Sequence, residues 1–487
     1  MHRYESTVEA LKEHARSNPD RMAVWAEDSQ LSYAQLYDLV CGFARYLLGI
    51  GIHRGDRVVM QALQSLGYVV AYYGTQLAGG VFAPVEMRIS TENMESFVEY
   101  TKAFLLISED ASSSTKWHSR HKIIETAERN MNSTDPLIFP GSDEHAEILS
   151  TSGTTGKPKG VLLSHKNTVA VAENIISSME YNDETFIIIP SPLNHATGTR
   201  RLTATVHNGS SAVILEGVLD IRNFFRIIDD MPVTGLILPP ATLSILLGLS
   251  KDRLSSFAEK IEFIESTAAH LSEETKVQLC ELLPKSRLYN NYGLSEAGAS
   301  CAYDYNALKG LENCIGAEAI NSHVFFVDDK FVEIESSKEI YGCLAISGDT
   351  VMMGYWDEPE LTAQTLVDGV LVTSDVGYIE DGLIFIVGRA DDLIQVGGYM
   401  VSPIEIEEAA MRCHEIEDCV CVALDDPVMG QVPRLYVVLK ESMELDVARI
   451  ITKLSEHLEP FKLPKQIETI DSIPRTELGK KIRRDLG

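Results

Sequence analysis

The sequence lacks several features that would point to particular classes of protein. Its 487 residues contain no run of about eighteen apolar residues, so we expect no membrane-spanning helix. The opening segment, residues 1–5, has no apolar core of the kind found in signal peptides, which predicts a cytoplasmic protein. The eight cysteines form no CxxC pair and no zinc-finger spacing with histidine, so we expect reduced, mostly buried thiols.

Basic residues are also scarce. The chain carries 42 Lys and Arg against 71 Asp and Glu, and its formal net charge is −29. Such a surface repels nucleic acid and anionic lipid, so we expect neither as a partner. An anionic ligand must therefore be bound by a local group of donors.

The length predicts more than one domain, and the pattern of the first 390 residues predicts an α/β fold. Ser32 and Gln35 form a capping box before a helix with apolar residues at helical spacing that ends at Gly49. Short apolar runs then alternate with helical stretches, which is typical of parallel sheets with helices on their faces. The expected strands are 186–189, 212–215, 235–238 and 261–264, and the expected helices are 221–229 and 241–249.

From Gly342 the apolar runs become short and are punctuated by glycine, which predicts a β-rich subdomain. Beyond Asp391, a helix start at Ser402-Pro403, two strands and a helix from Val447 predict a separate α+β domain. We therefore divide the chain into an N-terminal domain, 1–390, and a small, mobile C-terminal domain, 391–487.

The segment from Ser150 to Val161 is the most informative part of the sequence. It reads STSGTTGKPKGV and lies between the apolar pairs Ile148-Leu149 and Leu162-Leu163, so we expect it to join two buried strands. Glycines let the backbone approach an anion closely, hydroxyl and N–H groups donate to phosphate oxygens, and lysine adds charge. The segment is not a common P-loop, because Pro158 follows Lys157 where that motif requires Ser or Thr. A flexible surface linker is the alternative interpretation.

This segment, followed by Ser164-His165, resembles the signature loop of the adenylate-forming superfamily. That superfamily includes acyl-CoA synthetases, aryl-CoA ligases, luciferases and peptide-synthetase adenylation domains, and the chain is most like an acid–CoA ligase. The resemblance extends over nearly the whole chain. It implies ATP as a substrate and nucleotide binding by Thr151, Ser152, Gly153, Thr154, Thr155, Gly156 and Lys159.

Further motifs match in the order of the family. The segment 290–296, NNYGLSE, resembles the motif that stacks on adenine and holds Mg²⁺, which makes Glu296 the candidate metal ligand. The segment 266–269 resembles the strand end beside adenine, with Thr267 in place of the usual glycine. TSD at 373–375 resembles the ribose-binding motif. The resemblance implies nucleotide contacts from Ala268, Ala269, Asn291, Tyr292, Gly293, Ser295, Asp375 and Arg389.

The resemblance also implies a moving C-terminal domain. Asp391 matches the hinge, and Lys480 in the PRTELGKKIRR segment matches the catalytic lysine, which would stabilise charge at the α-phosphate. After adenylation the domain would rotate and bring Gly397 and Gly398 to an incoming thiol. Many relatives carry lysine where this chain has Gln395 and Gly397, which weakens the prediction for the thiol step. Taken alone, these residues also fit a solvated linker and a basic tail.

Residues 190–201, 239–243 and 297–300 match the segments of the family's acyl site, so the resemblance implies that they line the acid pocket. His195 is a candidate gate or orienting residue, with a simple local hydrogen-bonding role as the alternative. Arg200 and Arg201 are unexpected there. If either faces the pocket, the acid carries a second carboxylate or a polar head, because a buried cation needs an anion. The alternative is a helix face turned to solvent or to an acidic neighbour.

The resemblance therefore implies ATP- and Mg²⁺-dependent activation of a carboxylic acid to an acyl-adenylate, followed by transfer to the thiol of CoA. The first alternative is an enzyme that loads the acid onto the phosphopantetheine of a carrier protein. The second is a nucleotide-binding relative without ligase activity. The absence of a Phe-Asp motif argues against an amino-acid substrate.

Overall fold

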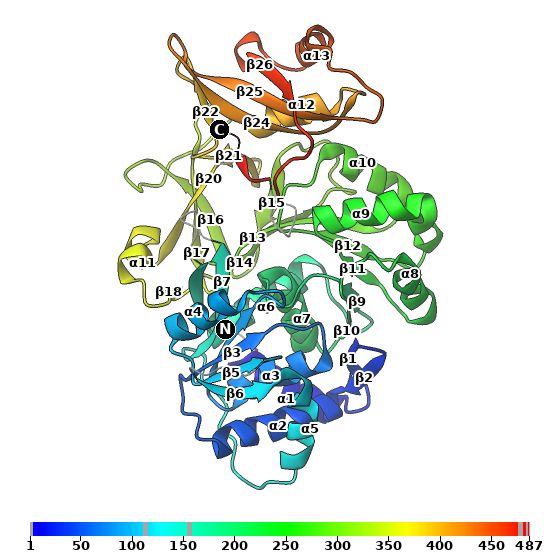
Figure 1. Cartoon of the computed structure of the whole chain (residues 1–487), viewed down its shortest axis with the longest axis vertical. Coiled ribbons are helices and arrows are strands. Elements are labelled where there is room, and N and C mark those ends of the chain that lie inside the picture. Colours follow the sequence, from blue (N-terminus) through cyan, green and yellow to red (C-terminus); the bar gives the residue numbers. More distant parts are fainter. Residues whose placement is uncertain (1–2, 111–114, 153–157, 476–480, 484–485, 487) are drawn as a thin grey trace.

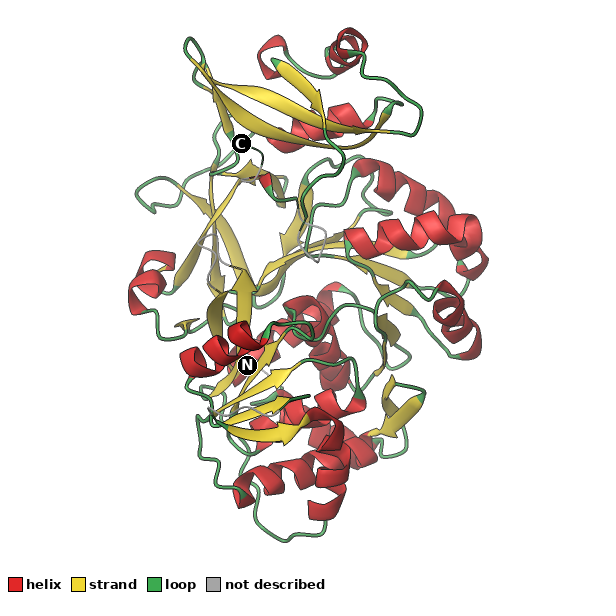
Figure 2. Cartoon of the chain, viewed as in Figure 1, coloured by secondary structure: helices red, strands yellow, loops and turns green. Residues whose placement is uncertain are grey.

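The computed structural model describes residues 3–110, 115–152, 158–475, 481–483 and 486, with the side chains of 151, 152 and 158 left out. These residues form three sheets, and the two larger sheets overlap along the long axis of the molecule (Figure 1). The N-terminal helices lie at one end and the C-terminal sheet at the other. Figure 2 shows helices on both faces of the two larger sheets. The predicted α/β class is confirmed.

The largest sheet combines a parallel half with an antiparallel half. Strands β1, β10, β9, β11, β12 and β13 pair in parallel, and the later strands pair antiparallel and form the predicted β-rich part. The order is β16-β17-β20-β21-β15-β14-β13-β12-β11-β9-β10-β1-β2, with β19 paired to β20. The strands are β1 (Met22–Ala26), β2 (Ser29–Ser32), β9 (Phe186–Ile189), β10 (Ser211–Ile214), β11 (Gly235–Ile237), β12 (Phe263–Ser266), β13 (Arg287–Leu294), β14 (Gly298–Asp304), β15 (Cys314–Glu318), β16 (Ser322–Val327), β17 (Gly342–Gly348), β19 (Leu366–Val367), β20 (Val370–Glu380) and β21 (Leu383–Arg389).

The second sheet has the order β18-β8-β7-β4-β3-β5-β6. Its central strands are fully buried on both faces, as parallel strands between helices require. Its strands are β3 (Arg57–Gln61), β4 (Val81–Val85), β5 (Leu105–Ser108), β6 (Lys116–Ser119), β7 (His145–Ser152), β8 (Pro158–Ser164) and β18 (Gly354–Tyr355).

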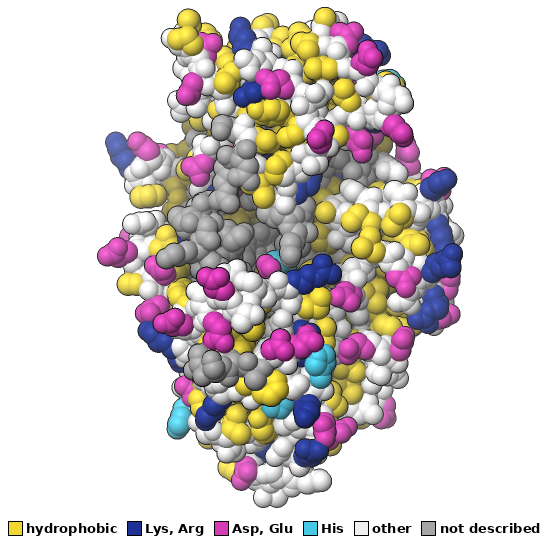
Figure 3. Space-filling view, viewed as in Figure 1, with side chains coloured by type: hydrophobic (Ala, Val, Ile, Leu, Met, Phe, Trp, Pro, Cys, Tyr) yellow, Lys and Arg dark blue, Asp and Glu magenta, His cyan; other side chains and the backbone are white. Residues whose placement is uncertain are grey.

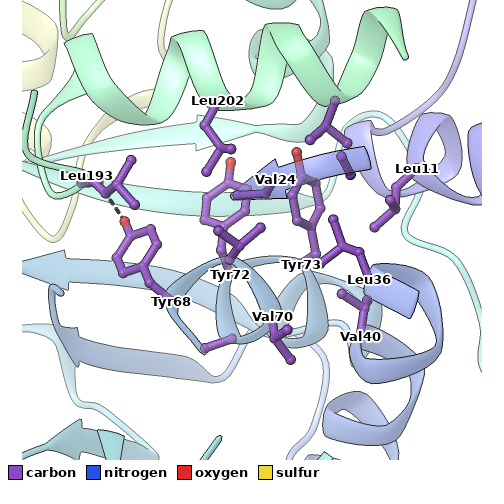
Figure 4. Close-up of a cluster of buried hydrophobic side chains, with 14 of the residues drawn as sticks. Leu11, Val24, Leu36, Val40, Tyr68, Val70, Tyr72, Tyr73, Leu193 and Leu202 are labelled. Carbon is purple, nitrogen blue, oxygen red and sulfur yellow. Dashed lines mark hydrogen bonds between the residues drawn. The ribbon is translucent and has the colours of Figure 1, made fainter. Parts of the chain in front are cut away.

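The helices pack on these two sheets and between them. They are α1 (Thr7–Ser17), α2 (Tyr33–Gly49), α3 (Leu66–Leu77), α4 (Thr91–Thr101), α5 (Ile123–Asn130), α6 (His165–Ser178), α7 (Ala196–Asn208), α8 (Ile221–Asp230), α9 (Pro240–Ser250), α10 (Glu273–Leu282) and α11 (Pro359–Thr365). The capping box before α2 is present as predicted. Tyr68, Tyr72 and Tyr73 of α3 are fully buried and point toward α7, where Leu202 packs (Figure 4). One core therefore joins α3, α7 and the largest sheet.

The C-terminal sheet has its own core, formed with α12 (Pro403–Met411) and α13 (Val447–Leu454). The Ser402 side chain accepts from Glu405 N and so caps α12. The Glu405 carboxylate accepts from Lys462 at 2.6 Å. His270 contacts Glu408 of α12 at 2.6 Å, which joins this part to the rest. Its strands are β22 (Ile394–Val396), β23 (Tyr399–Val401), β24 (Ile416–Asp426), β25 (Gly430–Leu439) and β26 (Gln466–Thr469).

The described surface carries charges of both signs. Acidic and basic side chains are interspersed on the face shown in Figure 3. Among the described residues no helix has both the length and the apolar character needed to cross a bilayer. Cys41, Cys301 and Cys421 are among the buried cysteines, and none of the eight forms a disulfide.

Candidate functional site

The predicted phosphate-binding segment joins two paired strands. Ile148 of β7 lies opposite Leu162 of β8, and both strands lead into the core. A Cβ at Gly160 would stand 2.7 Å from the Ile148 side chain, so only glycine fits this close approach. Gly153, Thr154, Thr155 and Gly156 lie outside the described residues, and Thr151 and Ser152 are described only as the end of β7. The strands therefore fix both ends of the segment.

Lys159 and Glu296 both contact Tyr355. The Lys159 ammonium lies 5.7 Å from the centre of the Tyr355 ring. The Tyr355 hydroxyl donates to Glu296 Oε1 at 2.9 Å. Tyr355 belongs to β18, which pairs with β8. Burial and the neighbouring Glu296 carboxylate raise the pKa of Tyr355, so the phenol stays protonated and donates. The predicted phosphate-binding lysine and the candidate metal ligand thus contact the same tyrosine of β18.

A second group brings three distant motifs together. The Tyr292 hydroxyl donates to Asp375 Oδ2 across 83 residues of sequence. Arg389 lies opposite Asp375 in the pairing of β20 with β21. Burial and Asp375 raise the pKa of Tyr292 well above its usual value, and Arg389 partly offsets this. Gly293 and Ser295 follow in the same strand end and its turn. The predicted adenine and ribose residues are therefore neighbours.

The segment after β12 departs from ordinary backbone geometry. Ala268 has φ +77°, in the left-handed region that favours glycine. Thr267 is 5% exposed, whereas Ala268 is exposed and Ala269 is half-buried. The strain lies one position after the residue where the family's glycine was expected. A strained backbone of this kind at a strand end is often functional.

Side chains of β13 alternate between two sides of the sheet. Tyr289 belongs to the core shared with α6 and α7, and Tyr292 packs against the core of the β-rich part. By the period of two, Asn291 shares the side of Tyr289. Its side chain is buried, and neither its Nδ2 nor its Oδ1 has a hydrogen-bond partner among the described residues. The predicted nucleotide residues Asn291 and Tyr292 thus face opposite sides.

The two arginines of α7 are buried, and each pairs with a glutamate. Arg200 forms an ion pair with Glu147 of β7, and Arg201 forms one with Glu265 of β12. Burial lowers the pKa of Arg200, but Glu147, together with Tyr72 and Tyr68, more than offsets this and leaves the pKa above its usual value. Of the two interpretations of these arginines, the structure agrees with an acidic neighbour. Both guanidinium groups find their anion within the protein.

His195 is the N-cap residue of α7, and no side-chain cap bond forms there. The segment before it is tied down by Gln64, whose amide accepts from Leu193 N at 2.9 Å and donates to Ser191 O at 2.9 Å. The Tyr68 hydroxyl also donates to Leu193 O at 2.6 Å. The start of α7 therefore has a fixed position over the carboxyl ends of the parallel strands.

The predicted hinge and thiol residues lie in the C-terminal part. Asp391 is exposed between β21 and β22. Gly397 and Gly398, with φ +57° and +92°, form a two-residue turn between β22 and β23, a turn that requires positive φ at both positions. Lys480 lies outside the described residues. Its neighbour Lys481 donates to Glu407 of α12 at 2.7 Å.

The sequence did not identify Glu147 and Glu265. Each is a fully buried carboxylate within an apolar strand. A lone acidic residue in such a strand signals a buried cation nearby, because an unpaired buried charge is costly. That signal, read together with the adjacent Arg200 and Arg201, could have identified both pairs.

Comparisons with known proteins agree with the geometry. Residues 11–356 match the model of the AMP-binding enzyme family, and residues 405–480 match the model of the AMP-binding enzyme C-terminal domain. The long-chain-fatty-acid–CoA ligase of Bacillus subtilis is 27% identical over 98% of this chain and 93% of its own. The fatty acid–[acyl-carrier-protein] ligase ScoC of Streptomyces coeruleorubidus is 27% identical over 99% of this chain and 96% of its own.

Solved structures share the fold. The ATP-bound MatB from Rhodopseudomonas palustris superposes with a TM-score of 0.88 at 23% identity over 98% of both chains. The o-succinylbenzoate CoA synthetase MenE from Bacillus subtilis, in complex with its acyl-adenylate intermediate, gives 0.85 at 21% identity, covering 98% of this chain and 97% of its own. The predicted resemblance is confirmed: the chain belongs to the AMP-binding enzyme family and is an AMP-forming acid–thiol ligase.

Proposed function

We propose that this chain converts a carboxylic acid and Mg-ATP into an acyl-adenylate and pyrophosphate, and then transfers the acyl group to the thiol of CoA. The observation that carries the proposal is the contact of Tyr292 with Asp375, opposite Arg389. Three motifs that are far apart in sequence meet there, beside the strands that hold the phosphate-binding segment. An adenosine and its phosphates need such a combination of aromatic, carboxylate and cationic groups.

In the first step an oxygen of the acid attacks the α-phosphate and pyrophosphate leaves. Tyr292 and Asp375 orient the nucleoside, and Lys159 attracts the phosphates. Lys480 supplies positive charge at the reacting phosphate. Such a contact typically contributes about 2–4 kcal/mol to the transition state. In the second step the thiolate attacks the acyl carbon, and AMP leaves with the bonding electrons.

Mg²⁺ would shield the phosphate charges, and Glu296 is its protein ligand in this proposal. The described residues contain no cluster of three or more His, Cys, Asp or Glu side chains that could hold a metal alone. A single carboxylate nevertheless suits Mg²⁺, which usually takes its remaining ligands from phosphate and water. Tyr355 fixes the orientation of that carboxylate.

The domain division at 390/391, the hinge at Asp391 and a cytoplasmic location belong to the same proposal. Strand β21 ends at Arg389 and β22 begins at Ile394, so the proposed hinge lies in the connection between the two parts. Rotation there would exchange Lys480 for the turn at Gly397 and Gly398.

Pyrophosphate release with Mg-ATP is the test, measured over mono- and dicarboxylic, aryl and fatty acids with and without CoA. Release that needs one class of acid and increases with CoA is the expected result. Release that CoA does not affect, but a phosphopantetheinylated carrier protein does, would favour the carrier-protein alternative, for which ScoC is a precedent by name. ATP binding without release for any acid would contradict the proposal.

A further inference from the structure

The first observation concerns the place of the Arg201–Glu265 pair. Glu265 lies near the carboxyl end of β12, the edge of a parallel sheet at which α/β proteins bind ligands. Arg201 reaches it from the second turn of α7, and its Nε lies 3.2 and 3.1 Å from the two carboxylate oxygens. The pair therefore connects the second turn of α7 to strand β12.

The space behind this pair is filled. Tyr181 lies close enough for both Glu265 and Arg201 to affect its pKa, which burial raises. Its ring packs on Phe263 at 5.6 Å between centroids, and Phe263 packs on Tyr289 at 6.3 Å. All these side chains belong to the core between α7 and the sheet. A ligand that enters from the carboxyl edge meets the ion pair before it meets this core.

The second observation is the unpaired amide of Asn291. Glu265 pairs in register with Tyr289, and Asn291 is two residues further along the same side of β13. It therefore lies one step nearer the carboxyl edge than the ion pair, on the side covered by α7. Both its amide oxygen and its amide nitrogen are buried and lack partners among the described residues. Buried amides usually make hydrogen bonds, so this amide points to a polar ligand group.

We infer that Arg201, Glu265 and Asn291 form the closed end of the acid pocket and select a short acid that carries a polar group at its far end. The ion pair blocks a longer chain. The amide of Asn291 can donate to a keto or carboxylate oxygen, and it can both donate to and accept from a hydroxyl or amide group. The inference rests on the proposed function, because it requires an acid substrate. It places that acid on the α7 side of β13.

Arg200 and Glu147 provide a matched control. They form a second buried ion pair from the neighbouring residue of the same helix, but they reach β7 of the other sheet. Removing that pair deletes the same chemical groups at the same depth of burial. Its loss affects the packing of α7 without opening the closed end described above.

The experiment compares kcat/KM over straight-chain acids of two to twelve carbons, each with a methyl, hydroxyl or carboxylate terminus. The intact protein is expected to favour short acids with a polar terminus. Arg201→Ala/Glu265→Ala is expected to shift the preferred length upward by two or more carbons, with the KM for ATP unchanged. Arg200→Ala/Glu147→Ala is expected to leave the length profile unchanged. Preference of the intact protein for long fatty acids, or equal shifts in both double variants, would overturn the inference.

Asn291→Ala and Asn291→Leu test the amide without disturbing the ion pair. Each is expected to lower kcat/KM about tenfold for acids with a polar terminus, the loss of roughly one hydrogen bond to a neutral partner, and to spare their methyl-terminated analogues. Equal loss for both series would contradict the role. Acid-dependent thermal shifts, measured without ATP, report binding directly. They therefore test the pocket even if no acid releases pyrophosphate, a result that would contradict the proposed function alone.

Discussion

Tyr292 and Asn291 are neighbours on β13, yet their side chains face opposite sides of the sheet and differ in their partners. Tyr292 donates to Asp375, so its side of the strand is already organised by contacts within the protein. Asn291 is buried without a hydrogen-bond partner among the described residues. The Tyr292 hydroxyl therefore has its partner before any ligand binds, whereas the Asn291 amide has none among the described residues. In the functions proposed above, the side of Tyr292 holds ATP and the side of Asn291 selects the acid.

The phosphate-binding segment and the Arg201–Glu265 pair differ in how far the sequence predicts them. The predicted phosphate-binding segment has glycine where the backbone approaches closely, as at Gly160, and its assignment to the nucleotide rests on its composition together with its resemblance to the family's signature loop. The wall on the acid side is made by Arg201 and Glu265, which are 64 residues apart. No local pattern joins them. Each follows only from the position of α7 over β12.

Lys480→Ala is expected to have the largest effect and to sharpen the contrast between holding ATP and using it. Adenylate formation should fall about a hundredfold or more, because positive charge at the reacting phosphate is lost. ATP binding should change little, since Tyr292, Asp375 and Lys159 remain. Rapid-quench measurement of adenylate, together with equilibrium binding of ATP, separates the two quantities. Equal losses in both would contradict the assigned role.

The ion pairs of α7 allow a comparison of stability between the two sides. Arg201→Met leaves Glu265 buried without its partner, and we expect a loss of about 3–5 kcal/mol in the free energy of unfolding. Arg201→Met/Glu265→Leu removes both charges and should recover most of that loss. Arg200→Met and Arg200→Met/Glu147→Leu should show the same pattern. Urea denaturation measures the free energy of unfolding of all four variants. A double variant as unstable as its single variant would show that an unpaired buried glutamate is not the cause of the loss.

A smaller effect of pH is expected on the nucleotide side, where α6 begins directly after β8. Burial lowers the pKa of His165, the first residue of α6, to about 3. An unfolded histidine titrates near pH 6.5, so the unfolded state binds an extra proton between these values. Stability is therefore complete above about pH 6.5 and falls below it, by up to about 1.4 kcal/mol per pH unit for this one group.

His165→Gln should flatten the pH dependence of the free energy of unfolding between pH 6.5 and 4. His121→Gln is the control, because the His121 side chain is exposed. Denaturation at several pH values measures the slopes. An unchanged slope in His165→Gln would show that this histidine contributes no proton linkage.

The prediction from sequence was most successful where one segment carries both the fold and the chemistry. Ser32 and Gln35 fixed the start of α2, and the apolar pairs around the phosphate-binding segment predicted two core strands. Tyr292 and Asp375 were predicted by motif, although only the fold shows their contact.

Prediction was weaker for interactions between distant residues. Arg200 and Arg201 left two interpretations open, because the sequence does not show which strand lies under α7. Ala268 adopts a left-handed φ that was not predicted from the sequence, where only the replacement of a glycine by Thr267 was noted. Asn291 was grouped with Tyr292 among the nucleotide residues, and only the alternation of β13 separates their sides. These outcomes depend on packing between elements, which local patterns do not encode.

Paired kinetics of Tyr292→Phe and Asn291→Ala test the central claim most directly, that β13 holds the nucleotide on one side and the acid on the other. With the preferred acid, Tyr292→Phe removes the hydroxyl that binds Asp375 and should raise the KM for ATP while sparing the KM for the acid. Asn291→Ala should do the reverse. If Asn291→Ala raises the KM for ATP as much as Tyr292→Phe does, both residues serve the nucleotide and the claim is contradicted.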